Sequence, residues 1–110
     1  MGAARFDEKV AGRLADTMFA LSTPSRVQIL GCLLGGPHAV SELMEALDME
    51  QSAVSHQLRV LREHTLVTSE RQGRRRVYAL HDDHVVTLLE AALAHVQQRA
   101  EAPRGVEGLG

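Results

Sequence analysis

The sequence lacks several features that mark particular classes of protein. Its 110 residues include a single cysteine, Cys32, so neither an internal disulfide nor a CxxC thiolate metal site can form. Cys32 lies in an apolar segment, which favours a buried thiol over a redox sensor. No apolar run approaches the roughly 20 residues that span a bilayer, and the first ten residues hold no signal-peptide-like segment. We therefore expect a cytoplasmic protein without membrane contact.

Sequence motifs of common enzymes are also missing. There is no glycine-rich phosphate loop, no nucleophile elbow and no HExxH motif, and a chain of this length does not easily build a deep pocket. We therefore expect that the protein is not an enzyme. A hydrophobic content of 45% suffices for one folded domain, which we place at residues 1–99. Residues 100–110 contain Pro103 and three glycines, and we expect a disordered tail there.

Positive charge is concentrated in one part of a mildly acidic chain. Residues 51–80 hold six arginines against two glutamates, a net charge of +4, whereas the rest of the chain carries −6. Such segregation creates a local positive potential, and the release of counterions rewards its contact with phosphates. The overall charge of −2 therefore does not argue against a nucleic-acid partner.

The first half of the chain has the pattern of short helices. Residues 7–20 carry apolar side chains at near-helical spacing, and Thr23 can cap a second helix that ends at Gly35. Ser41 can cap a short third helix, and Asp48 tolerates the left-handed conformation of a tight turn. Two short helices joined by such a turn are typical of a helix-turn-helix.

Residues 49–65 are predicted to form an amphipathic helix. Val54, Leu58 and Leu61 share one side, whereas short polar side chains and Arg59 share the other. Small hydrogen-bonding groups beside an arginine suit the base edges and phosphates of DNA. Taken alone, the segment fits an ordinary amphipathic surface helix equally well.

Residues 66–80 have the pattern of a β-hairpin. β-branched and aromatic residues flank Gln72 and Gly73, and three consecutive arginines, 74–76, follow at the turn and in the returning strand. Since neighbouring residues in a strand point to opposite faces, Arg74 and Arg76 cannot both belong to the core. The hairpin is a candidate DNA-binding wing; the alternative is a solvated hairpin whose charged edge prevents aggregation.

A last helix is predicted to follow Asp83 and to end near Arg99. Its apolar positions cover more of the circumference than one small core can bury, which indicates packing against a second subunit.

Three stretches resemble the ArsR/SmtB family of bacterial regulators: ALSTPSRVQIL, MEQSAVSHQLRVLREHTLV and RQGRRRVYAL. The resemblance covers roughly residues 10–98 and implies a mainly α winged helix-turn-helix with a small β-hairpin, in the order ααααββα. It also implies a homodimer formed through the terminal helices. One departure is Gln57, which stands where the family usually has a histidine; His56 is one residue earlier.

The resemblance further implies a sequence-specific DNA-binding transcriptional regulator. Its partner would be a double-stranded operator, an inverted repeat whose half-sites face two helices about 34 Å apart. Residues expected at base edges are Gln51, Ser52, Ser55, His56 and Gln57. Residues expected on phosphates are Arg59, Arg62, Arg71, Arg74, Arg75 and Arg76.

Asp82, His84 and His95 are candidate metal ligands. The two histidines are about 16.5 Å apart along a helix but nearly on one face, so only two antiparallel helices across a dimer axis could bring them together. This spacing resembles the sites of zinc-, nickel- or cobalt-sensing family members, with Gln98 where those members have a further histidine or glutamate. An amide is a poor ligand for a transition metal, so Gln98 is a weak candidate, and His81 or the terminal amine could add a donor. Alternatively, the histidines are ordinary surface residues and Asp82 is only a helix cap.

Two alternatives to metal-responsive DNA binding remain open at this point. The first is the same regulator with weak or no metal sensing, controlled by a partner protein or another signal. The second is a protein-interaction module that recruits its partner through the apolar last helix and has no specific DNA binding.

Overall fold

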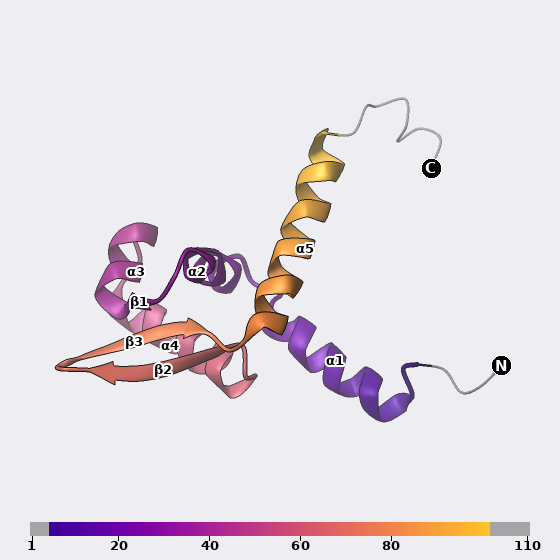
Figure 1. Cartoon of the computed structure of the whole chain (residues 1–110), viewed down its shortest axis with the longest axis horizontal. Helices are drawn as coiled ribbons and strands as arrows, with labels where there is room; N and C mark the ends of the chain where they lie inside the picture. Colours follow the sequence, from indigo (N-terminus) through magenta and orange to yellow (C-terminus); the bar gives the residue numbers. More distant parts are fainter. Residues whose placement is uncertain (1–4, 102–110) are drawn as a thin grey trace.

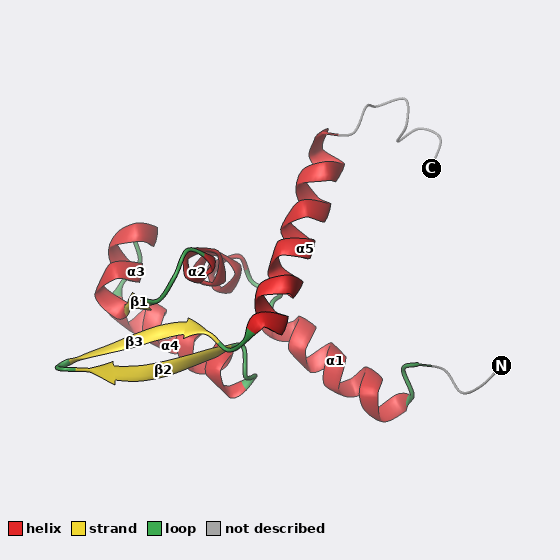
Figure 2. Cartoon of the chain, in the orientation of Figure 1, coloured by secondary structure: helices red, strands yellow, loops and turns green. Residues whose placement is uncertain are grey.

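A computed structural model describes residues 5–101 as five helices and three short strands (Figures 1 and 2). In chain order the elements are α1 (Glu8–Ala20), α2 (Pro24–Leu34), β1 (His38–Ala39), α3 (Val40–Leu47), α4 (Gln51–Glu63), β2 (Val67–Gln72), β3 (Arg75–Leu80) and α5 (Asp83–Glu101). Helix α5 thus extends two residues into the predicted tail, and the rest of that tail, 102–110, lies outside the described residues.

The predicted winged helix-turn-helix is confirmed, with one strand more than expected. The sheet has the strand order β1-β3-β2, and β1 pairs antiparallel with β3 through His38 opposite Tyr78 and Ala39 opposite Val77. The expected order ααααββα omitted β1, because a strand of two residues is too short to show alternation in the sequence.

Capping side chains explain where the helices begin. The Asp7 carboxylate accepts a hydrogen bond from the Val10 N–H (2.9 Å), and the predicted cap Thr23 accepts from the Arg26 N–H (3.4 Å). The predicted cap of α3 is wrong: the helix begins at Val40, so Ser41 already lies inside it. There the Glu42 carboxylate accepts from the Ala39 N–H instead (2.8 Å), because the chain enters α3 directly from β1.

The core lies between α2, α3 and α4. Ile29 and Leu30 of α2 pack with Leu43 of α3 and with the predicted inward residues of α4, of which Leu58 is 1% exposed. Val67 of β2 and Val85 of α5 join this cluster at its edge. The wing, defined here as the β2–β3 hairpin, is therefore anchored at its base to the helix-turn-helix.

Helices α1 and α5 project away from this core in different directions (Figure 1). Large apolar side chains along both remain exposed, including Phe19 (67%), Met18 (44%), Val96 (62%) and Leu93 (49%). An apolar groove between α2 and α5, lined by Val27 and Leu93 among others, continues this surface. No helix within residues 5–101 is long and apolar enough to cross a membrane.

Candidate nucleic-acid interface and metal centre

The outward face of α4 carries the polar residues that the sequence singles out. Gln51, Ser52, Ser55, His56 and Arg59 are all exposed, whereas Val54, Leu58 and Leu61 of the same helix are buried. The preceding turn is fixed by Asp48, which adopts the predicted left-handed conformation (φ 54°). The helix-turn-helix thus presents a polar helix face to solvent from a rigid base.

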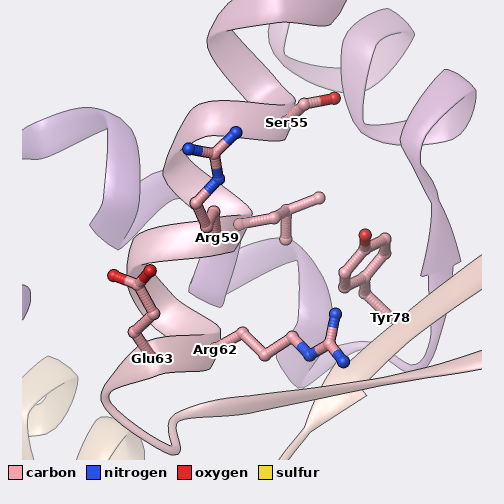
Figure 3. A pocket seen from close by; sticks show the side chains of 6 residues that line it. Ser55, Arg59, Arg62, Glu63 and Tyr78 are labelled. Atoms are coloured by element: carbon pink, nitrogen blue, oxygen red, sulfur yellow. The ribbon is translucent and has the colours of Figure 1, made fainter.

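A polar pocket of about 440 Å³ lies between α4 and the wing. Ser55, Arg59 and Arg62 line it from α4, and Tyr78 lines it from β3 (Figure 3). The side chain of Arg62 extends toward Tyr78, whereas Glu63 points away from the tyrosine. Leu58 and Glu63 also line the pocket, so two guanidinium groups and two hydroxyl groups stand against one carboxylate. This excess of hydrogen-bond donors and positive charge suits a phosphate anion.

The strand register divides the wing arginines between the two faces of the hairpin. Arg71 pairs with Arg76 and Ser69 pairs with Tyr78, so these four side chains share the face that meets α4. Arg76 Nη1 donates to Ser69 Oγ (3.1 Å), and Arg71 Nη1 donates to the Gly73 carbonyl (3.4 Å). Two arginines directly opposite each other repel, so an anion between them would be stabilising.

Arg75 belongs to the other face of the wing and is paired within the protein. Its Nη2 lies 3.2 Å from Glu42 Oε1 of α3, with both side chains half exposed. The hydrogen bond from the Ala39 N–H, followed by the charge of Arg75, lowers the pKa of the Glu42 carboxyl below its usual range. The resemblance implies that Arg75 contacts phosphate; since its guanidinium group is paired with Glu42, we expect it to contribute less to phosphate binding than Arg76 does.

Gln57 also differs from its neighbours on α4. It is half-buried, and its carbonyl Oε1 accepts a hydrogen bond from Nη1 of the buried Arg26 of α2 (3.0 Å). The sequence pattern already indicates that Gln57 points partly inward. Gln57 and the buried Leu61 are four residues apart, and at about 100° per residue their side chains lie within about 40° of each other around the helix.

The sequence did not single out Arg26, Glu42 or Tyr78. Alternation along β3 places Tyr78 on the same face of the wing as Arg76, opposite to Val77, so the sequence pattern could have grouped Tyr78 with Arg76. The partners of Arg26 and Glu42 are largely backbone groups, whose positions only the fold reveals.

Asp82 and His84 lie together at the start of α5. Asp82 Oδ1 accepts from the Val85 N–H (3.1 Å), while Oδ2 lies 3.6 Å from His84 Nδ1 and 3.9 Å from His81 Nε2. The bond from Val85 and then the adjacent histidines lower the pKa of the Asp82 carboxyl. One carboxylate oxygen therefore caps the helix and the other is available to a cation, so capping and metal binding are compatible at this residue.

His95 and Gln98 are exposed further along α5, away from Asp82 and His84. Within residues 5–101 of one chain, no three histidine, cysteine or acidic side chains lie close enough to hold a metal ion. Exposed imidazoles and a carboxylate are chemically suited to a divalent transition metal.

Comparisons with known proteins agree on the type of protein. A family model described as bacterial regulatory protein, arsR family, matches residues 23–69. The transcriptional regulator NmtR of Mycobacterium tuberculosis is 53% identical over 92 residues, covering 84% of this chain and 77% of that protein. A SmtB-homologous transcriptional repressor of Synechocystis sp. is 39% identical over 88 residues, covering 80% and 67%.

Solved structures show the same architecture. The solution structure of apo-NmtR superposes with a TM-score of 0.74 at 50% identity and covers 88% of this chain and 82% of that one. The homodimeric winged helix-turn-helix domain Mb0332 of Mycobacterium bovis superposes with a TM-score of 0.82 at 26% identity, covering 92% and 94%. The M. tuberculosis and Synechocystis relatives are transcriptional regulators. This confirms the predictions that the chain is a DNA-binding regulator and that it is not an enzyme, and it does not favour the interaction module.

Proposed function

Because this chain belongs to the ArsR/SmtB family of DNA-binding transcriptional regulators, we propose that it acts as a homodimer that binds an inverted-repeat operator. We further propose that a divalent transition metal (nickel, cobalt or zinc), held between the two α5 helices, changes its operator affinity. Such a regulator would act in the cytoplasm, where the chromosome lies.

The donor-rich pocket between α4 and the wing is the observation that carries the DNA-binding assignment. The pocket would hold one backbone phosphate between Arg59 and Arg62, with the Tyr78 hydroxyl as a further donor. Arg71, Arg74 and Arg76 would continue the phosphate contacts along the wing. Phosphate contacts fix the register of the protein on the duplex, and base contacts supply the sequence preference. The base contacts would come from Gln51, Ser52, Ser55 and His56.

The exposed apolar side chains of α1 and α5 support the dimer. Their exposure in a single chain is unfavourable in water, and a second copy that buries them would remove about 25 cal/mol of penalty for each Å² covered. A two-fold axis would place two copies of α4 about one DNA turn, roughly 34 Å, apart.

The arrangement at Asp82 supports the metal site. Asp82 and His84, at the start of one α5, would meet His95 of the partner's α5 if the two helices pack antiparallel, with Gln98 as a weak fourth candidate. The metal would supply a cross-link between subunits. It would alter operator affinity only if it binds one dimer geometry more tightly than another.

Operator binding tests the proposed reading surface, defined here as the exposed side chains of Gln51, Ser52, Ser55 and His56 on α4. Fluorescence anisotropy with the promoter of the protein's own operon should show salt-sensitive binding that is lost in a Ser55→Glu, His56→Glu double variant. The matched control is Glu45→Gln, an exposed change on α3 that should leave binding intact. Binding by the double variant at wild-type strength would contradict the assignment.

Calorimetry with nickel, cobalt and zinc tests the metal site. The wild type should bind one of these metals more tightly than a His84→Ala, His95→Ala variant, whereas His56→Ala, which removes an exposed histidine from α4, should bind as the wild type does. Equal binding by all three proteins would contradict the site. Metal binding that leaves operator affinity unchanged would contradict metal control and favour regulation by another signal.

A further inference from the structure

Arg26 is the one polar residue of the buried set in residues 5–101, with 7% of its surface exposed. Its guanidinium group makes three hydrogen bonds to two other helices. Nε donates to the Ala20 carbonyl (2.6 Å), Nη2 donates to the Phe19 carbonyl (3.3 Å), and Nη1 donates to Gln57 Oε1 (3.0 Å). Among the described residues, no carboxylate forms an ion pair with it.

The partners of Arg26 explain how its charge is accommodated. The carbonyls of Phe19 and Ala20 end α1, and the last carbonyls of a helix carry partial negative charge. Since arginine has no acceptor, only the carbonyl oxygen of the Gln57 amide can face it, which fixes the orientation of that side chain. A buried guanidinium that lost one of these acceptors would be left with an unsatisfied donor, so the whole arrangement resists displacement.

From this geometry we infer that Arg26 and Gln57 are positioning residues that set the orientation of α4 relative to the end of α1. Gln57 holds the reading helix from behind and does not contact bases. Because α1 carries part of the exposed apolar surface assigned to the dimer, a shift at the end of α1 is passed to α4 through a rigid, planar group. The inference rests on the proposed role of α4 in reading DNA.

Glutamate substitutions at two positions of α4 distinguish a positioning role of Gln57 from a direct contact with DNA. Ser55 and Gln57 are two residues apart, so their side chains point in nearly opposite directions. Gln57→Glu should keep operator affinity within about threefold of wild type, because the carboxylate accepts the hydrogen bond of Arg26 with added charge. Ser55→Glu should weaken binding by about thirtyfold or more, because it places a negative charge on the surface that meets phosphates.

The two variants separate failure of this inference from failure of the proposed function. If Gln57→Glu weakens binding as much as Ser55→Glu, then Gln57 faces DNA and the inference is wrong while the reading surface stands. If Ser55→Glu binds as the wild type does, the proposed reading surface is wrong, and the inference fails with it.

Removal of the hydrogen-bond acceptor at Gln57 tests the positioning role in a second way, because loss of a base contact would change the preference among operator sequences. Gln57→Met should weaken binding to every operator sequence by about tenfold, leaving the preference among single-base-pair operator variants unchanged. Arg26→Lys should have a similar effect, and the double variant should bind no more weakly than the weaker single one, because both residues act through one link. Gln28→Met, an exposed change on α2, is the matched control.

An altered preference at one operator position in Gln57→Met, or additive losses in the double variant, would overturn the inference. Thermal melting of each variant accompanies the binding data. Should Gln57→Met fail to fold, the comparison of Gln57→Glu with Ser55→Glu still decides.

Discussion

Separate replacement of Arg75 and Arg76 by glutamine should have unequal effects on the salt dependence of operator binding. The two residues are neighbours in β3 but lie on opposite faces of the wing. Arg76 shares its face with Arg71 and Tyr78, whereas Arg75 lies 3.2 Å from Glu42. If phosphates bind on the face that meets α4, only Arg76 releases counterions on binding.

The expected size of the difference follows from the number of phosphates lost. Each neutralised phosphate contributes about −0.9 to the slope of log affinity against log salt concentration, and a dimer without Arg76 loses two, or about 1.8. An increase in salt from about 50 to 200 mM should therefore weaken operator binding of Arg76→Gln by a factor about twelvefold smaller than the factor for the wild type. Arg75→Gln should change the slope by less than about 0.5, since Glu42 already balances that charge.

Fluorescence anisotropy of a labelled operator over a series of potassium chloride concentrations measures both slopes. Thermal melting serves as the control for folding, and both variants should melt close to the wild type because an exposed ion pair such as Arg75–Glu42 contributes little to stability. Equal slopes for the two variants, or a larger change in Arg75→Gln, would refute the division of the wing into a phosphate-binding face and an internally paired face.

Three further perturbations test other parts of the structure. Leu93→Glu should convert the dimer to a monomer in sedimentation equilibrium, because Leu93 lies on the apolar surface of α5; Thr87→Glu, an exposed change on the same helix, should not. Thr65→Asn should raise the free energy of unfolding in urea by about 1 kcal/mol, since Thr65 has a φ of 55° and asparagine tolerates that conformation better; a loss of stability would contradict this. The pKa of Glu42 is lower in the folded protein than its ordinary value of 4.5, so the ionised carboxylate stabilises the fold. This stabilisation is fully present above pH 4.5 and is lost as the pH falls through the lower pKa of the folded protein. Acid titration should therefore destabilise Glu42→Gln less than the wild type, and equal losses would count against this role.

The sequence predicts the helix-turn-helix well because its signals are local. The buried side of α4 follows from the spacing of Val54, Leu58 and Leu61, and the turn before it follows from the tolerance of Asp48 for left-handed geometry. The pattern of α5 likewise predicts more apolar surface than one core buries, and Leu93 and Val96 are indeed exposed.

Features that depend on contacts distant in the sequence were not predictable in the same way. Strand β1 is too short for a periodic pattern, and its pairing with β3 arises only when the wing folds back. The burial of Arg26 depends on the carbonyls that end α1, and the pairing of Arg75 depends on the approach of α3 to β3. The candidate metal ligands Asp82, His84 and His95 are grouped by the resemblance, because within residues 5–101 of one chain His95 does not lie with Asp82 and His84.

The short strand β1 has a mechanical consequence for regulation. Two pairs of residues link it to β3, and it leads directly into α3, so the base of the wing is tied to the helix-turn-helix. A displacement of α3 should therefore carry the base of the wing with it. In the proposed dimer, a signal that changes the packing of α1 and α5 between subunits would then move the contacts of α4 and those of the wing together.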